Sequence, residues 1–296
     1  MASIVDSERK WSATAELYIK YFEPFTVAMG VKLLSNLKLH HASEPIQIIE
    51  CGSGSGGLGM EIYRVLASNV TDAFSHRLCM VDISESMTES ARRRMASLPY
   101  NGVDLQLQVC DATSLEGSHD SGSFNRYICN MTLHYAPDGD ALLREAARLL
   151  APGGIAGFSV WGKEALSDAF TILPRIKMTL GLDEPTTTAG TSASASKKTR
   201  SNFHMGENDD ALRSRVLDAG FRTCVVWHAQ SVVEAVSAAD YVRTMTEGSY
   251  STQQEMLQWS SDQRKQFLSN VQDEAEAIFG RGGPIGLDVC YIIATR

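Results

Sequence analysis

Apolar segments of strand length alternate with helical patterns over residues 46–161, and this alternation limits the fold more than any other feature of the chain. Five segments are rich in Ile, Val, Leu, Cys or aromatic side chains: Ile46–Cys51, Arg77–Asp82, Val103–Val109, Phe124–Asn130 and Gly154–Trp161. Helical spacing of apolar residues lies between them, at Leu58–Ala67, Ser84–Ser97 and Asp138–Leu150. Strands that alternate with helices are typical of right-handed βαβ units. We therefore predict an α/β fold with a doubly wound, mostly parallel sheet.

The chain on either side of this alternation is predicted to add helices and two more strands. Residues 8–37 carry apolar side chains at helical spacing with a break at Pro24, so residues 1–45 are predicted to form an N-terminal helical cap. Downstream, the pattern predicts one helix and two strands, over Asn208–Ala219, Phe221–Val233 and Gly286–Thr295. We expect the two late strands to finish the sheet as an antiparallel pair with a long connection.

Residues 46–296 are then the main domain, and two of its parts depart from the alternation. Residues 235–280 show helical patterning and are predicted to form a helical insert that completes the cap. Residues 183–203 are rich in Ser, Thr and Ala. Such a segment buries too little apolar surface to offset the entropy of ordering, so we predict a disordered loop there.

The composition excludes several classes of protein. The formal net charge is -8, which argues against a nucleic-acid partner, because such partners select Lys- and Arg-rich surfaces. No apolar run approaches the roughly 18 residues of a transmembrane helix, so we expect no integral membrane association. The first ten residues lack the cationic and apolar parts of a signal peptide, which predicts a cytoplasmic location.

The cysteines and histidines give no sign of a metal site. The six cysteines contain no CxxC pair, and the seven histidines contain no HxxxH or HExxH spacing. We predict that no metal is bound and that the cysteines are free thiols.

A glycine-rich stretch after the first predicted strand is the sharpest local signal for a ligand site. It reads Glu50-Cys51-Gly52-Ser53-Gly54-Ser55-Gly56-Gly57 and precedes a predicted helix. Glycines in this place allow a tight turn and let the bare backbone approach a ligand. The stretch satisfies two patterns, the GxGxxG of dinucleotide binding and the acidic-x-GxGxG of S-adenosylmethionine (SAM) binding. On its own it does not choose between them.

Acidic residues at the ends of three predicted strands bear on that choice. Glu50 closes the first strand, where a carboxylate suits a ligand with an ammonium group better than a pyrophosphate. Asp82 ends the second strand and can accept ribose hydroxyls in either kind of site. Asp111 follows the third strand, at the position of an acid that reads an adenine amine in SAM enzymes. Two of the three positions favour SAM.

Five motifs in order make the chain similar to a known family. The segments IIECGSGSGG, MVDISESMTESARRRM, VCDATSL, SFNRYICNMTLHYAPD and LLREAARLLAPGGIAGFSVWG resemble those of the class I SAM-dependent methyltransferases. The similarity is greatest to the quinone-biosynthesis and related small-molecule methyltransferases. It implies a seven-stranded, Rossmann-like sheet with one antiparallel strand and a methyl donor, SAM, that is converted to S-adenosylhomocysteine.

The same resemblance assigns cofactor roles to single residues. It implies that the methionine end of SAM lies against Glu50, Gly52, Ser53, Gly54 and Gly56. It further implies a ribose contact at Asp82, adenine contacts at Ile83, Asp111 and Ala112, and a position below the methionine for Asn130.

Candidates for the acceptor side follow the fourth and fifth predicted strands, because ligands of open parallel sheets bind beyond the carboxyl ends of the strands. His134 is a candidate general base and Tyr135 its neighbour, while Trp161 is a candidate substrate contact. Tyr18 and Tyr21, on the N-terminal helix, are candidate contacts from above. The aromatic and Met side chains of the two cap segments suit a small apolar or aromatic methyl acceptor.

The predicted function is methyl transfer from SAM to a small organic molecule at an O, N or C centre. Two alternatives stay open at this point. One is an NAD(P)-dependent oxidoreductase that uses the GxGxxG pattern, and the other is a SAM-binding protein without catalytic activity.

Overall fold

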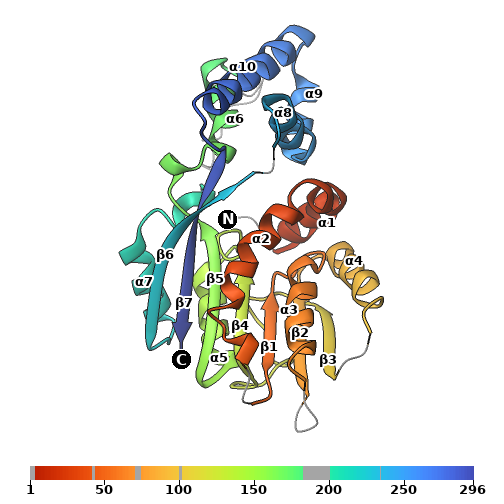
Figure 1. Ribbon diagram of the computed structural model, residues 1–296, viewed down its shortest axis with the longest axis vertical. Helices are drawn as coiled ribbons and strands as arrows, with labels where there is room; N and C mark the ends of the chain where they lie inside the picture. The colour runs from red at the N-terminus through yellow and green to blue at the C-terminus, as the bar shows by residue number, and fades with distance from the viewer. Residues whose placement is uncertain (1–3, 42–43, 71–74, 100–101, 183–200, 234) are drawn as a thin grey trace, which may run out of the picture.

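Seven strands form one sheet in the order β3-β2-β1-β4-β5-β7-β6 (Figure 1). The computed structural model describes residues 4–41, 44–70, 75–99, 102–182, 201–233 and 235–296. The strands are β1 (Gln47–Cys51), β2 (His76–Asp82), β3 (Val103–Val109), β4 (Phe124–Asn130), β5 (Leu150–Trp161), β6 (Thr223–Val232) and β7 (Gly286–Thr295). All seven lie where the sequence pattern predicts strands.

The five strands from β1 to β5 are parallel, and β7 is the antiparallel member. β1 pairs with β2 and β4, with Ile48 opposite Leu78 and Arg126. β7 pairs antiparallel with both β5 and β6. The predicted mostly parallel, doubly wound, seven-stranded sheet is confirmed, as is the antiparallel pair formed by the last two strands.

Helices cover both faces of the sheet and separate two apolar clusters. Alternate residues of β1 point to opposite faces, so Ile48 belongs to one cluster and Ile49 to the other. Helices α2 (Glu23–Leu34), α3 (Gly57–Ala67) and α4 (Glu85–Met95) contribute to the first cluster. Helices α5 (Gly139–Leu149) and α7 (Asp209–Asp218) contribute to the second. Helices α4 and α5 begin where Ser84 and Asp138 accept a hydrogen bond from a backbone N–H of the first turn.

The N-terminal segment divides into a helix above the sheet and a helix on its face. Helix α1 (Ile4–Tyr21) ends just before Phe22, and Pro24 lies in the first turn of α2, where its missing N–H costs no helical hydrogen bond. Met29 and Leu33 of α2 are fully buried against the sheet. Within the predicted N-terminal cap over residues 1–45, α2 is thus part of the layered core, whereas α1 lies above the sheet.

A separate group of helices stands beyond the carboxyl ends of the parallel strands (Figure 1). It contains α6 (Asp168–Thr179), α8 (Ala238–Glu247), α9 (Tyr250–Gln258) and α10 (Ser261–Gly280), which we call the cap helices. The predicted insert over 235–280 holds three of them. Helix α6, which the sequence pattern did not predict, lies outside that range and carries Pro174 in its interior.

The short 3-10 helices are η1 (Leu39–His41), η2 (Glu164–Leu166) and η3 (Asn202–His204). The predicted loop over 183–203 lies outside the described residues except for its last three. Of these, Asn202 and Phe203 begin η3, and Phe203 is buried.

Candidate active site

One cavity of about 800 Å³ opens between the carboxyl ends of the strands, helix α1 and the cap helices. Its volume is within the range of about 300–1,000 Å³ that holds small-molecule ligands. One end is lined by residues that follow β1 to β4, among them Gly52, Gly54, Asp82, Ile83, Asp111, Ala112, Asn130 and Thr132. The other end is lined mainly by residues of α2, α6, α8 and α9. We call these two parts the strand-end half and the cap half.

The glycine loop after β1 turns sharply and is fixed to β2. The backbone N–H groups of Gly52 and Ser53 both donate to the carbonyl of Val81, over 2.8 and 3.0 Å. Gly52, Gly54 and Gly56 have positive φ angles of 72°, 54° and 85°, a region that costs residues with a Cβ about 1–2 kcal/mol. The loop therefore needs glycine at these positions, and Gly52 and Gly54 present bare backbone to the cavity.

Replacing Gly52 with Ala is expected to lower the free energy of unfolding by about 2–4 kcal/mol, which chemical denaturation can measure. The positive φ accounts for about 1–2 kcal/mol, and overpacking adds about 1–3. The overpacking arises because an added Cβ would lie 2.6 Å from the Cβ of Thr132, closer than side chains approach.

Gly153→Ala is the matched control for this prediction. Gly153 has a φ of 81°, and an added Cβ would meet nothing within 4 Å, so this variant isolates the backbone cost. Equal losses of stability in the two variants would contradict the close approach of Gly52 to Thr132.

Asp82 joins the glycine loop to the end of β2 and lines the cavity. Its Oδ2 accepts from the N–H of Gly54 at 2.8 Å, and its Oδ1 accepts from the N–H of Ser84 at 2.9 Å. Burial raises the pKa of the carboxyl, and these backbone hydrogen bonds oppose the increase. A carboxylate oxygen has two lone pairs, so each can accept one further hydrogen bond from a ligand.

Glu50 lies behind the loop and is not among the lining residues. The residue is buried, and within the described part of the chain its Oε2 has no hydrogen-bond partner. Burial, and secondly the charge of Asp82, raises the pKa of Glu50 from 4.5 to about 8. A buried carboxylate without a partner is unfavourable, so Glu50 is stabilised either by a ligand cation nearby or by binding a proton.

The other predicted cofactor residues on the strand ends divide between the cavity and the loop. Asp111 lines the cavity beside Ala112, and its carboxylate accepts from the N–H and the hydroxyl of Thr113 at 2.9 and 2.8 Å. Asn130 lines the cavity and fastens three elements, donating to the carbonyl of Thr26 and accepting from the Ser159 hydroxyl. Ser53 and Gly56 belong to the loop but do not line the cavity.

One face of α1 covers the strand-end half of the cavity. Its lining residues follow helical spacing: Ser7, Lys10, Trp11, Thr14 and Tyr18. The Tyr18 hydroxyl is 2.6 Å from that of Thr26, and the Trp11 ring is 5.3 Å from the Tyr135 ring. The sequence-based prediction included Tyr18 alone, although the regular spacing of this face was visible in the sequence.

A partly buried polar cluster connects the glycine loop to two helices, and sequence reasoning missed it. The Oε1 of Glu23, in α2, accepts from the Ser55 hydroxyl and from Arg94 of α4, the latter at 2.6 Å. Arg94 also donates to the carbonyl of Ser55. The three residues are far apart in the sequence, so no local pattern indicates the cluster.

The three predicted acceptor-side residues at or beyond the ends of β4 and β5 occupy two different places. Tyr135 and Trp161 line the cavity, with ring centroids 6.4 Å apart. His134 is buried, is not among the lining residues, and packs against the Tyr135 ring at 4.1 Å. The geometry therefore gives no support to a general base at His134. Burial raises the pKa of Tyr135, so its phenol stays protonated at neutral pH.

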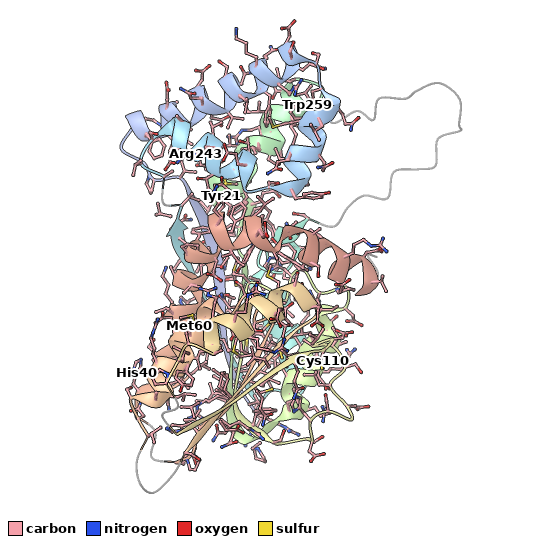
Figure 2. All side chains as sticks on the ribbon, turned by 90° about the vertical axis from the view of Figure 1, so that its right-hand side faces the viewer. Tyr21, His40, Met60, Cys110, Arg243 and Trp259 are labelled. Atoms are coloured by element: carbon pink, nitrogen blue, oxygen red, sulfur yellow. The ribbon has the colours of Figure 1, made fainter. Side chains whose placement is uncertain are left out.

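Tyr21, a predicted substrate contact, is not among the residues that line this cavity. It lines a smaller cavity of about 260 Å³ together with Phe22 and Arg243. Figure 2 shows Tyr21 and Arg243 at the junction of α1 with the cap. The Tyr21 hydroxyl donates to Glu247 of α8 at 2.5 Å. Tyr21 fastens α1 to the cap helices.

Aromatic side chains dominate the cap half where it meets β5. The Trp161 ring lies 4.4 Å from that of Phe170, which is 6.1 Å from Phe22 and 6.2 Å from Phe25. All four line the cavity. Met131, which directly follows β4, also lines the cavity. Its φ of 52° is a strained value for a residue with a Cβ.

The described residues contain no group of three or more His, Cys, Asp or Glu placed to hold a metal ion. In the same ranges, no helix has both the length and the apolar character needed to cross a bilayer.

Comparison with known proteins connects this site to an enzyme class. Residues 48–154 match the family described as methyltransferase domain. The methyltransferase tpcH of Aspergillus fumigatus is 28% identical over 117 residues, which are 40% of this chain and 39% of that protein. The highly reducing polyketide synthase lcsB of Purpureocillium lilacinum is 29% identical over 119 residues, which are 39% of this chain and 4% of the synthase. The match thus spans less than half of either relative.

Solved structures show the same fold over most of the chain. Phosphoethanolamine N-methyltransferase 2 of Haemonchus contortus, solved with phosphomonomethylethanolamine and S-adenosylhomocysteine, has a TM-score of 0.50 and 17% identity, covering 91% of this chain and 52% of that one. The YcgJ protein of Bacillus subtilis has the same TM-score and identity, covering 90% and 98%.

The seven-stranded sheet and the glycine loop at its carboxyl edge define a Rossmann-like α/β protein with a ligand site beyond its strands. Residues 48–154 match a methyltransferase domain, and the chain has the fold of class I SAM-dependent methyltransferases. The domain match favours SAM over a nicotinamide dinucleotide as the ligand of the glycine loop.

Proposed function

We propose that the protein transfers a methyl group from SAM to a small organic acceptor with an apolar or aromatic body. The observation that carries this proposal is one continuous cavity, which joins the strand-end half to an aromatic chamber around Trp161 and Phe170. Donor and acceptor can therefore meet inside a single cavity, as an in-line transfer requires.

The strand-end half fits SAM. The bare backbone of Gly52 and Gly54 leaves room beside β1, Asp82 has lone pairs for ribose hydroxyls, and Ile83 and Ala112 offer apolar contact for a base. We propose that these residues, with Asp111 and Asn130, hold the cofactor. SAM supplies a methyl group on a sulfonium, whose leaving group is a neutral thioether. The protein's task is then to orient the two ligands and to exclude water.

The walls of the cavity limit how the protein itself can assist the transfer. No His is among the described lining residues, and Tyr135, with its raised pKa, is a hydrogen-bond donor at neutral pH rather than a base. We propose that Tyr135 orients the acceptor. A protein base is unnecessary for a nucleophile that is reactive without deprotonation.

Calorimetric titration followed by a turnover assay tests this function. We expect micromolar binding of SAM and S-adenosylhomocysteine, no binding of NAD(P)H, and formation of S-adenosylhomocysteine when SAM is supplied with a panel of aromatic compounds that carry hydroxyl, amino or nucleophilic carbon groups. SAM binding without turnover on a broad panel would favour a catalytically silent SAM-binding protein. Nicotinamide binding alone would restore the oxidoreductase alternative.

Trp161→Leu is expected to lower kcat/KM for such an acceptor at least 10-fold and to change SAM affinity by less than about 3-fold, because the indole faces the cap half. Trp227→Leu is the matched control, since Trp227 stacks on Tyr291 and is not among the lining residues. Equal kinetic effects of the two variants would contradict the placement of the acceptor.

A further inference from the structure

The cap half of the cavity contains an ion pair that the proposed methyl transfer does not use. Five charged side chains are among the described lining residues: Lys10, Asp82, Asp111, Lys177 and Glu255. The first three belong to α1 and the strand ends. Lys177 of α6 and Glu255 of α9 belong to the cap, and the Lys177 Nζ lies 2.7 Å from the Glu255 Oε2.

The position of Lys177 along α6 fixes its distance from the aromatic chamber. Phe170, Leu173, Pro174 and Lys177 line the cavity from one face of the helix, at helical spacing. Helix α6 leads from the end of the sheet toward α10 (Figure 1). Seven residues at 1.5 Å each place Lys177 about 10 Å along the axis from Phe170, which contacts Trp161.

The two members of the pair differ in their exposure. The Lys177 side chain is 15% exposed, whereas that of Glu255 is 43% exposed. An ammonium group carries three donors, and Glu255 takes one of them. Lys177 is thus a cation held at the cavity wall with donors left for a ligand, while its partner can turn to solvent.

The surroundings of the pair suit a polar group at the end of an apolar ligand. Between the chamber and Lys177 the α6 wall is apolar, formed by Leu173 and Pro174. Around the pair, the segment leading into α9 and its first turns contribute hydroxyl and amide side chains, namely Ser249, Ser251, Thr252 and Gln254. An acceptor that fills both regions has an apolar body and an anionic oxygen group at its far end.

We propose that Lys177 determines acceptor specificity by binding a carboxylate that lies about 10 Å from the part of the acceptor held at Trp161. The acceptor class is an amphipathic carboxylic acid with an aromatic body. This inference rests on the proposed function, because it concerns the acceptor half of the same cavity. Glu255 holds Lys177 in place when no acceptor is bound.

The probes for this proposal are para-hydroxyphenyl alkanoic acids of increasing chain length, each paired with its methyl ester. Binding is measured by calorimetry with and without saturating S-adenosylhomocysteine. We expect the acids to bind at least 10-fold more tightly than their esters, with an optimum chain length, because a charge-assisted hydrogen bond is lost in the ester. Lys177→Met should lower acid affinity to that of the ester and leave ester affinity within about 3-fold.

The double variant Lys177→Glu/Glu255→Lys separates specificity from a structural role of the pair. It keeps the ion pair between α6 and α9, so the melting temperature should stay that of the wild type, while the preference for acids over esters should fall. Loss of the preference in Lys177→Met together with its full retention in the double variant would assign the pair to cap packing and overturn the proposal.

Equal affinities of acids and esters for the wild-type protein, or an acid preference that survives Lys177→Met, would also overturn it. Absence of S-adenosylhomocysteine binding would instead contradict the proposed function, and the comparison in the cofactor-free protein still tests Lys177.

Discussion

Asp82→Asn is expected to lower the affinity for SAM at least 100-fold, which corresponds to about 2.7 kcal/mol. The carboxylate faces the cavity and accepts from the Gly54 and Ser84 N–H groups, so its free lone pairs are fixed for two ribose hydroxyls. A hydrogen bond to a charged group contributes about 1.5–3 kcal/mol, and an amide in its place offers one acceptor instead of two. Calorimetric titration with SAM measures the loss.

Asp104→Asn is the matched control, because Asp104 is an exposed residue of the neighbouring strand β3 and is not among the lining residues. It should bind SAM as the wild type does. Asp82 ends its strand, so the sheet should persist in Asp82→Asn, and far-ultraviolet circular dichroism checks this. A folded Asp82→Asn protein with unchanged SAM affinity would remove the ribose assignment.

The stability of the cofactor-free protein is expected to fall by about 3–5 kcal/mol between pH 4.5 and pH 8 because of Glu50. Its pKa is raised to about 8 in the folded state, against 4.5 for the free group. Below pH 4.5 the carboxyl is protonated in both states, so its contribution is fully retained. As the pH rises, the unfolded chain ionises first, and the loss is complete once the pH passes the folded pKa. Urea denaturation at a series of pH values measures it.

Glu50→Gln removes the titration, so the difference in unfolding free energy between this variant and the wild type should grow over the same pH range. Glu276→Gln is the control, because Glu276 is exposed on α10. If the free energy of unfolding depends on pH in the same way in the wild type and in Glu50→Gln, the buried carboxyl does not titrate in this range. If Glu50 holds the ammonium of methionine, saturating SAM should lower its pKa and flatten the wild-type curve.

The central sheet and the cofactor edge were largely predictable because their signals are local. A buried strand such as Ile46–Cys51 is a short apolar run, and a glycine at positive φ, such as Gly52, follows it directly in the sequence. Acids at strand ends come together because parallel strands end at one edge of the sheet, so Asp82 and Asp111 line one cavity. Their roles toward SAM remain predictions.

The cap was predicted less well because its structure depends on tertiary contacts. Helix α6 contains Pro174, whose missing N–H weakens the sequence signal for a helix, yet packing of Ala169, Ile172 and Leu173 stabilises it. Helix α2 was assigned to the cap because helical spacing does not say which surface the helix meets.

Two predicted site residues do not line the cavity, and the reason is the same for both. Tyr21 is one turn beyond Tyr18 on α1, but it faces Glu247 instead of the main cavity. His134 precedes Tyr135 directly, and the chain turns there so that the phenol faces the ligand space and the imidazole packs behind it. Side chains that are close in the sequence can therefore point toward different parts of the structure, and the sequence pattern does not show which.

Strand β7 is the last of the seven in chain order, yet it lies inside the sheet between β5 and β6. During synthesis, β6 leaves the ribosome before the strand that pairs with it, and about fifty residues of cap helices are made in between. Until β7 emerges, β5 and β6 present open edges that can pair with other chains. The cap helices are therefore synthesised before the strand that closes the sheet beneath them, and truncation before Gly286 would remove an interior strand rather than a tail.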